Sequence, residues 1–453
     1  MTFLTRKLLL VACAIIFILV APALVLYAIG YRPNGISAPS VVGVLLIESE
    51  PRKADILVDG KAAGRSPKAI SNIPIGQASL RLEKEGYGPW QKTVAVESTR
   101  TSEFNNIRLF PSPIPQTILA RDVAQFALAP NRQLLSHVSG SGILKVTDTT
   151  GEEIVPARQL PAIPQRMLWS PDSNSILLGY PSQKLEVLTI GDPTQPPQPI
   201  QPSVSVADIA WDLRVPGRLV ILSTDGSLAA YSTGTQTMTP LARGIRTFAV
   251  SARRIFVVTY QNKIQALNLQ GRVVDDIAHE FQTPVARLLL TPTGNMAVQF
   301  ADTSLVVLEE EESAPLPVAT QAQATGWSPD GQMLYVQPNN NELVVYNVTD
   351  ERAVHIPLRK SQLVISLSRP LTDPQWFAGG HHLIYQVGDE IFITEIDTRD
   401  HPINTAIDTT NLGEAHVMVG EEGETLFYLK QQGGQKSLIR ADLSLETKKA
   451  AGE

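Results

Sequence analysis

A short turn followed by an apolar, strand-like segment recurs eight times along the chain from residue 128 onward. After a polar turn, each copy is followed by a second strand-like segment, such as "ILKVTDT" or "ELVVYNV". These second segments recur at a mean interval of about 42 residues, the length of a four-stranded propeller blade. Helical periodicity is nearly missing there. The first segments begin at Leu128, Trp169, Trp211, Val250, Leu290, Trp327, Phe377 and Val419.

The repeat predicts an all-β fold whose largest part is a β-propeller over residues 119–447. Seven or eight blades fit the spacing, and the count of copies favours eight. Closing such a ring usually requires the first and last blades to join, so we expect one terminal unit to share strands. A proline-stiffened linker, residues 111–118, precedes the propeller.

Two copies of the turn, "WSPDS" and "WSPDG", contain a serine two residues before an aspartate. A catalytic pair of this kind needs a histidine, and neither copy has one nearby. Turn geometry explains the residues better, because proline fixes φ, aspartate bonds its own backbone and glycine supplies a positive φ. We expect the tryptophan to pack between neighbouring blades. The residues assigned to these turns are Trp169, Pro171, Asp172, Trp327, Pro329, Asp330 and Gly331.

The pentapeptide followed by a strand is similar to the blade signature of TolB-like and WD40-like propellers, including those associated with peptidases. This resemblance implies a ring that binds a protein or another ligand, and an extracytoplasmic location in the TolB case. If the propeller belonged to a peptidase, a hydrolase domain with a G-x-S-x-G motif would follow it. The sequence contains no such pentapeptide.

Strand-like alternation also marks residues 41–110. In "ADILVDG", Ala54 and Ile56 point to one side and Asp55 to the other, and Asp59-Gly60 gives a hairpin turn signal. "ASLRLEKEGY" and "WQKTVAVES" repeat the alternation. We therefore expect a small all-β sandwich ahead of the linker.

The order of turns in this region resembles the PEGA domain. The namesake tetrapeptide departs from the family, since Pro51-Arg52-Lys53-Ala54 lacks the glycine. The resemblance implies a surface or envelope module of bacteria and archaea, and it implies no catalysis. The residues that carry it are Pro51, Ala54, Asp59, Gly60, Gly64, Ser66, Pro67, Gly76, Gly86 and Tyr87.

The N-terminal run Leu8–Ile29 carries no charge and is long enough to cross a hydrocarbon core. Arg6 and Lys7 precede it and favour a cytoplasmic N-terminus. We therefore expect a transmembrane helix over residues 8–30, which binds the membrane through Leu8–Ile29. A cleaved signal peptide is the alternative, although its apolar core is usually shorter.

That span predicts a single-pass protein of the cell membrane, with residues 1–7 cytoplasmic and the bulk of the chain extracytoplasmic. "LVAC", ending at Cys13, looks like a lipoprotein cleavage box, but the apolar run continues well past it. Cys13 is also the only cysteine, so the chain can form no internal disulfide.

Composition and motifs exclude several function classes. The net charge of −6 argues against nucleic-acid binding, which needs a clustered basic surface. Paired-cysteine zinc motifs are excluded, the seven histidines are scattered, and phosphate-binding glycine motifs are missing, so we expect no metal and no cofactor.

Three functions remain. We favour a non-catalytic envelope protein, not an enzyme, in which the PEGA-like domain and the propeller bind an envelope protein or a wall polysaccharide. The alternatives are a propeller enzyme that acts on envelope polysaccharide or peptide, and a scaffold whose helix pairs with another membrane protein. A cluster of Asp, Glu or His at one mouth of the ring would favour the enzyme.

Overall fold

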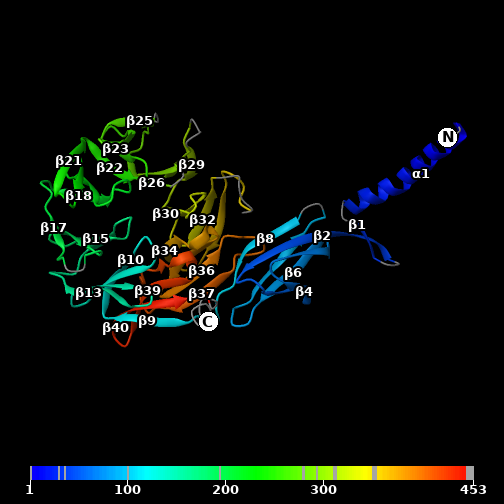
Figure 1. Cartoon of the computed structure of the whole chain (residues 1–453), viewed down its shortest axis with the longest axis horizontal. Coiled ribbons are helices and arrows are strands. Elements are labelled where there is room, and N and C mark those ends of the chain that lie inside the picture. The colour runs from blue at the N-terminus through cyan, green and yellow to red at the C-terminus, as the bar shows by residue number, and fades with distance from the viewer. Residues whose placement is uncertain are drawn as a thin grey trace. The chain divides into compact units, whose positions relative to one another are not determined.

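The computed structural model describes residues 3–28, 31–34, 37–98, 101–192, 195–277, 281–291, 294–309, 314–348 and 355–444. The chain divides into two compact units. Unit 1 contains Met1–Pro113, Thr398–Ile403 and Ser444–Glu453, and unit 2 contains Ile114–Asp397 and Asn404–Leu443. Figure 1 labels their elements in chain order.

Unit 1 begins with a helix and continues as two four-stranded sheets. One sheet has the order β1-β2-β5, with β8 parallel to β2, and the other has the order β4-β3-β6-β7. The elements are α1 (Phe3–Ala28), β1 (Tyr31–Asn34), β2 (Ser37–Glu50), β3 (Asp55–Val58), β4 (Lys61–Arg65), β5 (Lys68–Pro74), β6 (Gly76–Glu83), β7 (Trp90–Val96) and β8 (Thr101–Arg108).

Alternating side chains build the core of this sandwich. Every second residue of β7 is buried, and β6 follows the same period. The inward face of β7 includes Lys92, whose side chain is buried with its tip 5.8 Å from the Trp90 ring centre. The core residues come from both sheets and include Leu45, Ile47, Ile56, Leu80, Leu82, Trp90 and Phe104.

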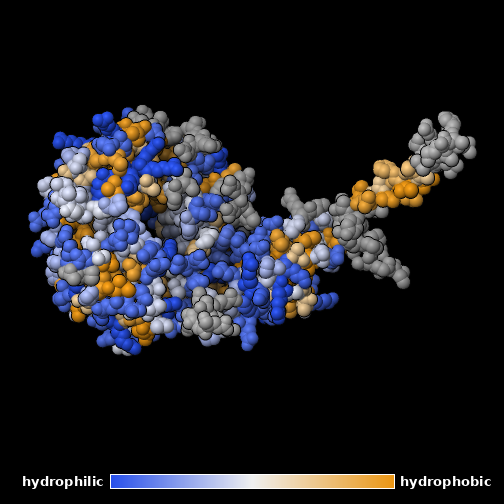
Figure 2. Space-filling model, in the orientation of Figure 1, coloured by the Kyte–Doolittle hydropathy of each residue, from blue (hydrophilic) through white to orange (hydrophobic). Residues whose placement is uncertain are grey.

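The prediction of a membrane span is wrong. In the part of the chain that the structure describes, no helix combines the length and the apolar character that a membrane crossing needs. The described side chains of α1 are hydrophobic (Figure 2).

This finding overturns the transmembrane helix at residues 8–30, of which 29 and 30 lie outside the described residues. It also removes the basis for membrane binding through Leu8–Ile29 and for a single-pass location with a cytoplasmic N-terminus. The prediction rested on the length and the lack of charge of this run, and both are necessary for a span without being sufficient.

Unit 2 consists, in its described residues, of eight successive sheets of four antiparallel strands, which we number as blades 1 to 8. In Figure 1, their first strands lie nearer the middle and fourth strands such as β17, β21 and β25 lie at the periphery. This is the architecture of a β-propeller, as the repeat predicts.

The first four blades span residues 123 to 277. Blade 1 contains β10 (Val123–Leu128), β11 (Leu134–Ser139), β12 (Ile143–Asp148) and β13 (Glu153–Gln159), and blade 2 contains β14 (Arg166–Trp169), β15 (Ser175–Gly179), β16 (Leu185–Thr189) and β17 (Gln198–Ile200). Blade 3 contains β18 (Val206–Trp211), β19 (Arg218–Ser223), β20 (Leu228–Ser232) and β21 (Thr237–Ala242). Blade 4 contains β22 (Ile245–Val250), β23 (Ile255–Thr259), β24 (Ile264–Leu267) and β25 (Val273–Ile277).

The next four blades complete the unit. Blade 5 contains β26 (Val285–Leu290), β27 (Met296–Phe300), β28 (Leu305–Leu308) and β29 (Leu316–Ala319), and blade 6 contains β30 (Ala324–Trp327), β31 (Met333–Gln337), β32 (Glu342–Asn347) and β33 (Ser361–Ser366). Blade 7 contains β34 (Leu371–Trp376), β35 (His382–Val387), β36 (Glu390–Glu395) and β37 (Asn404–Thr409). Blade 8 contains β38 (Met418–Val419), β39 (Thr425–Gln432), β40 (Gln435–Asp442) and β9 (Gln116–Arg121). Short 3-10 turns, η1 (Ala378–Gly380) and η2 (Glu421–Gly423), follow β34 and β38.

Blade 8 joins the two ends of the unit. Its outer strand is β9, the first strand of unit 2, which pairs antiparallel with β40 from Gln116↔Ala441 to Arg121↔Ser437. Apolar contacts support the same joint, since Phe126 of blade 1 and Phe427 of blade 8 belong to one buried cluster. The ring is therefore closed by backbone hydrogen bonds within one sheet.

The core of unit 2 lies between neighbouring blades. Leu177 of blade 2 and Leu219 of blade 3 share one buried cluster, and Ala297 of blade 5 and Leu334 of blade 6 share another. Burial of these faces is the main stabilising contribution, about 25 cal/mol for each Å² of apolar surface removed from water.

Candidate functional site

The serine and aspartate of the "WSPDG" turn are bonded to each other and to the turn itself. Ser328 Oγ donates to Asp330 Oδ1 at 2.6 Å and accepts the amide N–H of Met333 at 2.9 Å. The turn is closed by the Gly331 amide, which donates to the Ser328 carbonyl at 2.8 Å, with Gly331 at φ 70°. Both polar side chains thus satisfy backbone groups that the tight turn leaves unpaired.

The "WSPDS" turn of blade 2 repeats this arrangement. Ser170 Oγ donates to Asp172 Oδ1 at 2.5 Å and accepts the Ser175 amide at 2.9 Å. Burial raises the pKa of Asp172, but hydrogen bonds from Ser170 and Asn174 outweigh it and hold the pKa below its usual value. An aspartate held ionised by its own turn is an acceptor and not a general acid.

The tryptophans at the ends of inner strands bind neighbouring blades together. Trp376 donates its indole N–H to the Gly326 carbonyl at 2.8 Å, and Trp327 donates to the Leu289 carbonyl at 3.1 Å. Each acceptor lies on the first strand of the preceding blade. In the same way, Trp211 donates to the Leu168 carbonyl of blade 2, and Trp169 donates to the Ala127 carbonyl of blade 1. The sequence predicted this packing for Trp169 and Trp327, whereas in blade 7 it placed Phe377 at the position that Trp376 occupies. The repeated hydrogen bond adds direction to the packing.

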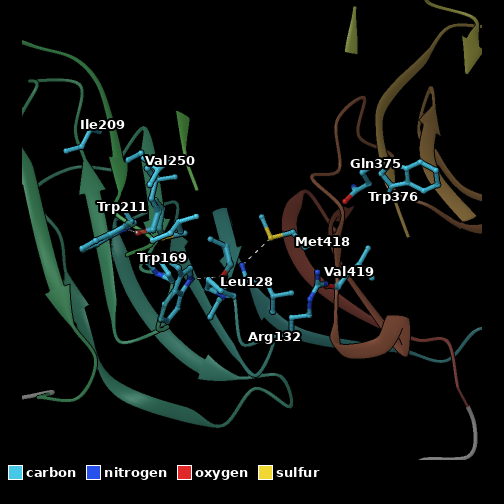
Figure 3. A pocket seen from close by; sticks show the side chains of 18 residues that line it. Leu128, Arg132, Trp169, Ile209, Trp211, Val250, Gln375, Trp376, Met418 and Val419 are labelled. Carbon is cyan, nitrogen blue, oxygen red and sulfur yellow. Dashed lines mark hydrogen bonds between the residues drawn. The ribbon is translucent and has the colours of Figure 1, made fainter. Parts of the chain in front are cut away.

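The ends of the inner strands surround a cavity of about 800 Å³, which we call the inner cavity (Figure 3). Six blades contribute to it, namely blades 1 to 4, 7 and 8. Most of the lining is apolar. The lining residues are Ala127, Leu128, Ala129, Pro130, Arg132, Met167, Leu168, Trp169, Pro171, Ile209, Ala210, Trp211, Leu213, Val250, Gln375, Trp376, Met418 and Val419.

The polar groups of this lining are already engaged. Arg132 donates to the carbonyl oxygens of Val419 and Gly420, and Gln375 donates to the Val417 carbonyl at 2.9 Å. The Leu128 amide points at Met418 Sδ, 3.1 Å away (Figure 3). No Asp, Glu or His is among the described lining residues. The inner cavity therefore offers apolar contact and shape more than hydrogen bonding.

Blade 3 departs from the turn motif in a way that the sequence did not disclose. Asp212 replaces the serine, and its fully buried carboxylate binds Arg214 at 2.8 Å and Arg218 at 2.5 Å. Burial raises the pKa of Asp212, but the hydrogen bond and charge of Arg214 outweigh it and lower the pKa. Between Asp212 and Arg214, Leu213 lines the inner cavity with 48% of its surface exposed.

One sequence signal could have found this site. Six residues lie between Trp211 and Arg218, where β19 begins, whereas five lie between Trp327 and Met333, where β31 begins. The extra residue and the two arginines mark a turn built around an ion pair instead of a serine. Without the fold, nothing in the copy of the repeat that begins at Trp211 indicated that Leu213 lines a cavity.

The residues of the PEGA-like motif gather at turns of unit 1. Ser66 links two of these turns, because its Oγ lies 2.6 Å from Ser49 Oγ and accepts the Ala54 amide at 3.1 Å. Asp59 Oδ1 accepts the Ser79 amide at 2.8 Å. Pro51 and Ala54 are buried, Pro67 is exposed, Tyr87 bridges to Pro111, and the glycines with positive φ are Gly60, Gly64, Gly76 and Gly86.

Lys53 occupies the third position of the namesake tetrapeptide, where the family has glycine. Its φ is 62°, in the left-handed region that glycine adopts without strain. The turn therefore has a backbone conformation suited to glycine, and a lysine carries its strain.

Comparison with known proteins supports both units. Residues 42–109 match the PEGA domain family. Unit 2 resembles the C-terminal WD40 domain of Sif2, at 9% identity and a TM-score of 0.51, over 72% of this chain and 97% of that chain. The Dos1 propeller matches at 9% identity and a TM-score of 0.51, over 72% of this chain and 94% of that chain.

Unit 2 has a β-propeller fold. Because the identity is only 9%, the likeness to these two propellers shows the fold alone. None of the curated proteins matches the chain. Within the described residues, no group of three or more His, Cys, Asp or Glu side chains is placed to hold a metal ion.

Proposed function

We propose that the protein is a non-catalytic binding module whose propeller receives an apolar segment of a protein partner in the inner cavity. The supporting observation is the cavity itself, at about 800 Å³ and lined mainly by aliphatic and sulfur-containing side chains. Pockets of this size with an apolar lining are the usual form of ligand sites. The matched PEGA domain and the propeller fold are both suited to binding or scaffolding.

The cavity chemistry favours a protein segment over a wall polysaccharide. A sugar needs many hydrogen-bonding partners and an exposed aromatic face, whereas Trp169, Trp211 and Trp376 are buried between blades. The polar atoms of Arg132 and Gln375 are bonded within the protein. An apolar side chain would bury surface there without leaving polar groups unpaired.

The same geometry argues against the alternative of a propeller enzyme. The serine and aspartate of each strong turn copy are hydrogen-bonded to each other within that turn. A hydrolytic site would require an acid or base directed at bound substrate. The described lining supplies neither. We therefore assign no catalytic residue.

The test uses the full chain and fluorescein-labelled 12-residue peptides of Gly and Ser with a central Leu-Phe-Leu. Fluorescence anisotropy should show binding, and the Leu213→Asp substitution should weaken it at least about ten-fold by placing a charge in an apolar site. The matched control is Leu269→Asp, which alters an exposed leucine outside the cavity lining.

Equal binding by both variants would move the site away from the inner cavity. Absence of peptide binding, together with binding of purified wall polysaccharide, would replace the protein partner with a glycan. Circular dichroism of each variant separates a lost site from a lost fold.

A further inference from the structure

Cations concentrate on the turns that follow the inner strands of blades 3 and 4. The blade 3 turn carries Arg214, with Arg218 at the start of the next strand. In blade 4, Arg253 is exposed, three residues after the cavity-lining Val250. One flank of the cavity is therefore basic.

The carboxylate of the blade 3 turn does not neutralise that flank. Asp212 serves two guanidiniums at once. One buried carboxylate against two largely buried arginines leaves an excess positive charge. Arg214 Nη1 is buried without a hydrogen-bond partner among the described residues. In a low-dielectric surrounding, this charge acts over a longer range than a solvated one.

The opposite flank has the reverse sign. In blade 8 the turn after Val419 carries Glu421, Glu422 and Glu424, in and beside η2. Val419 itself lines the cavity. Charge thus changes from basic to acidic across an apolar centre, so the cavity distinguishes the two sides of whatever enters it.

We propose that the inner cavity selects an extended protein segment in which carboxylates flank the inserted apolar side chain on the side of blades 3 and 4. This rests on the proposed function and names its ligand class. The apolar centre supplies the anchor, and the basic flank favours acidic neighbours and rejects basic ones. Among the arginines of the basic flank, Arg253 is exposed. Its neighbour Arg254 pairs with Asp275 at 3.1 Å.

The experiment compares three labelled peptides that share the Leu-Phe-Leu core and differ only in flanking Glu, Gln or Lys. With the full chain at 50 mM salt, the Glu peptide should bind about three- to ten-fold more tightly than the Gln peptide, and the Lys peptide more weakly than both. Raising the salt to 500 mM should bring the three together.

Arg253→Glu should reverse or abolish the preference for Glu. Its matched control is Lys263→Glu, which makes the same charge change in the same blade, on an exposed residue at the other end of β23. The control should keep the preference.

Two failures are distinguishable. If the three peptides bind equally at low salt and Leu213→Asp still abolishes binding, the proposed function stands and the acidic ligand class is wrong. If none binds, both are wrong. A preference for Glu that Arg253→Glu and Lys263→Glu reduce alike would overturn the assignment to the basic flank.

Discussion

The indole nitrogen of Trp376 lies 2.8 Å from the carbonyl oxygen of Gly326, and this hydrogen bond joins the innermost strands of two adjacent blades. Trp376→Phe keeps an aromatic ring but removes the donor. Because it leaves a shielded carbonyl unpaired, we expect a loss of about 1–2 kcal/mol in the free energy of unfolding. Trp376→Ala should cost about 3–5 kcal/mol, since it also removes packing. Urea denaturation measures both, and a Trp376→Phe variant as stable as the unsubstituted protein would show that the hydrogen bond contributes nothing.

Ser328→Ala distinguishes a turn residue from a nucleophile. Its Oγ accepts the amides of Gln332 and Met333, so its removal should lower the free energy of unfolding by about 1–2 kcal/mol. Ser182→Ala, at an exposed serine, should change it by less than about 0.5 kcal/mol. If the two variants were equally stable, the structural role of Ser328 would be refuted.

The ion pair of blade 3 should matter far more than an exposed one. Asp212→Asn leaves Arg214 and Arg218 without their counter-charge in a buried site, and we expect a loss of about 3 kcal/mol. The comparison is Asp275→Asn, which breaks the exposed pair with Arg254 and should cost less than about 1 kcal/mol. Thermal unfolding at equal pH and salt ranks the two, and the reverse order would contradict the burial argument.

Lys53→Gly should stabilise unit 1. The left-handed backbone at φ 62° costs a lysine about 1 kcal/mol, and glycine relieves that strain at a smaller entropic cost. Arg52→Gly, at the neighbouring exposed position, gains no such relief and should destabilise by about 0.5–1 kcal/mol. Chemical denaturation of the two variants should therefore move in opposite directions.

His137 should make the protein sensitive to mild acid. It is buried on β11, and burial, followed by the charge of Lys145, lowers its pKa from 6.5 to about 4, with Glu153 opposing. Above pH 6.5 the side chain is neutral in both states and contributes no pH dependence. As the pH falls toward 4, the unfolded state takes up the proton first, so stability declines by up to about 1.4 kcal/mol per pH unit.

The pH dependence has a direct control. His137→Gln should flatten the dependence of unfolding free energy between pH 6.5 and 4. A slope that survives His137→Gln would assign the acid sensitivity to other groups.

The sequence predicted what is local or repeated. The spacing of strand pairs indicated the propeller because each blade is one supersecondary unit. The role of Asp330 followed from turn chemistry within five residues, and the PEGA resemblance from an ordered set of turn residues in unit 1. The prediction of an N-terminal membrane span failed because a long uncharged run is necessary for a span without being sufficient.

The inner cavity was beyond the sequence for a different reason. Leu128, Leu213 and Met418 meet there from three blades, and no pattern along the chain relates them. Lys53 shows the same limit in a turn, since a lysine gives no sign that its backbone is left-handed. Sites made by assembly of distant residues become visible only once the ring is closed.

Closure of that ring also sets an order of events during synthesis. β9 leaves the ribosome before any other strand of unit 2, yet its partner β40 follows about 300 residues later. Until then β9 is an unpaired edge strand, and pairing over such a separation is slow and exposed to aggregation. The nascent propeller must therefore protect its first strand until its last has been made.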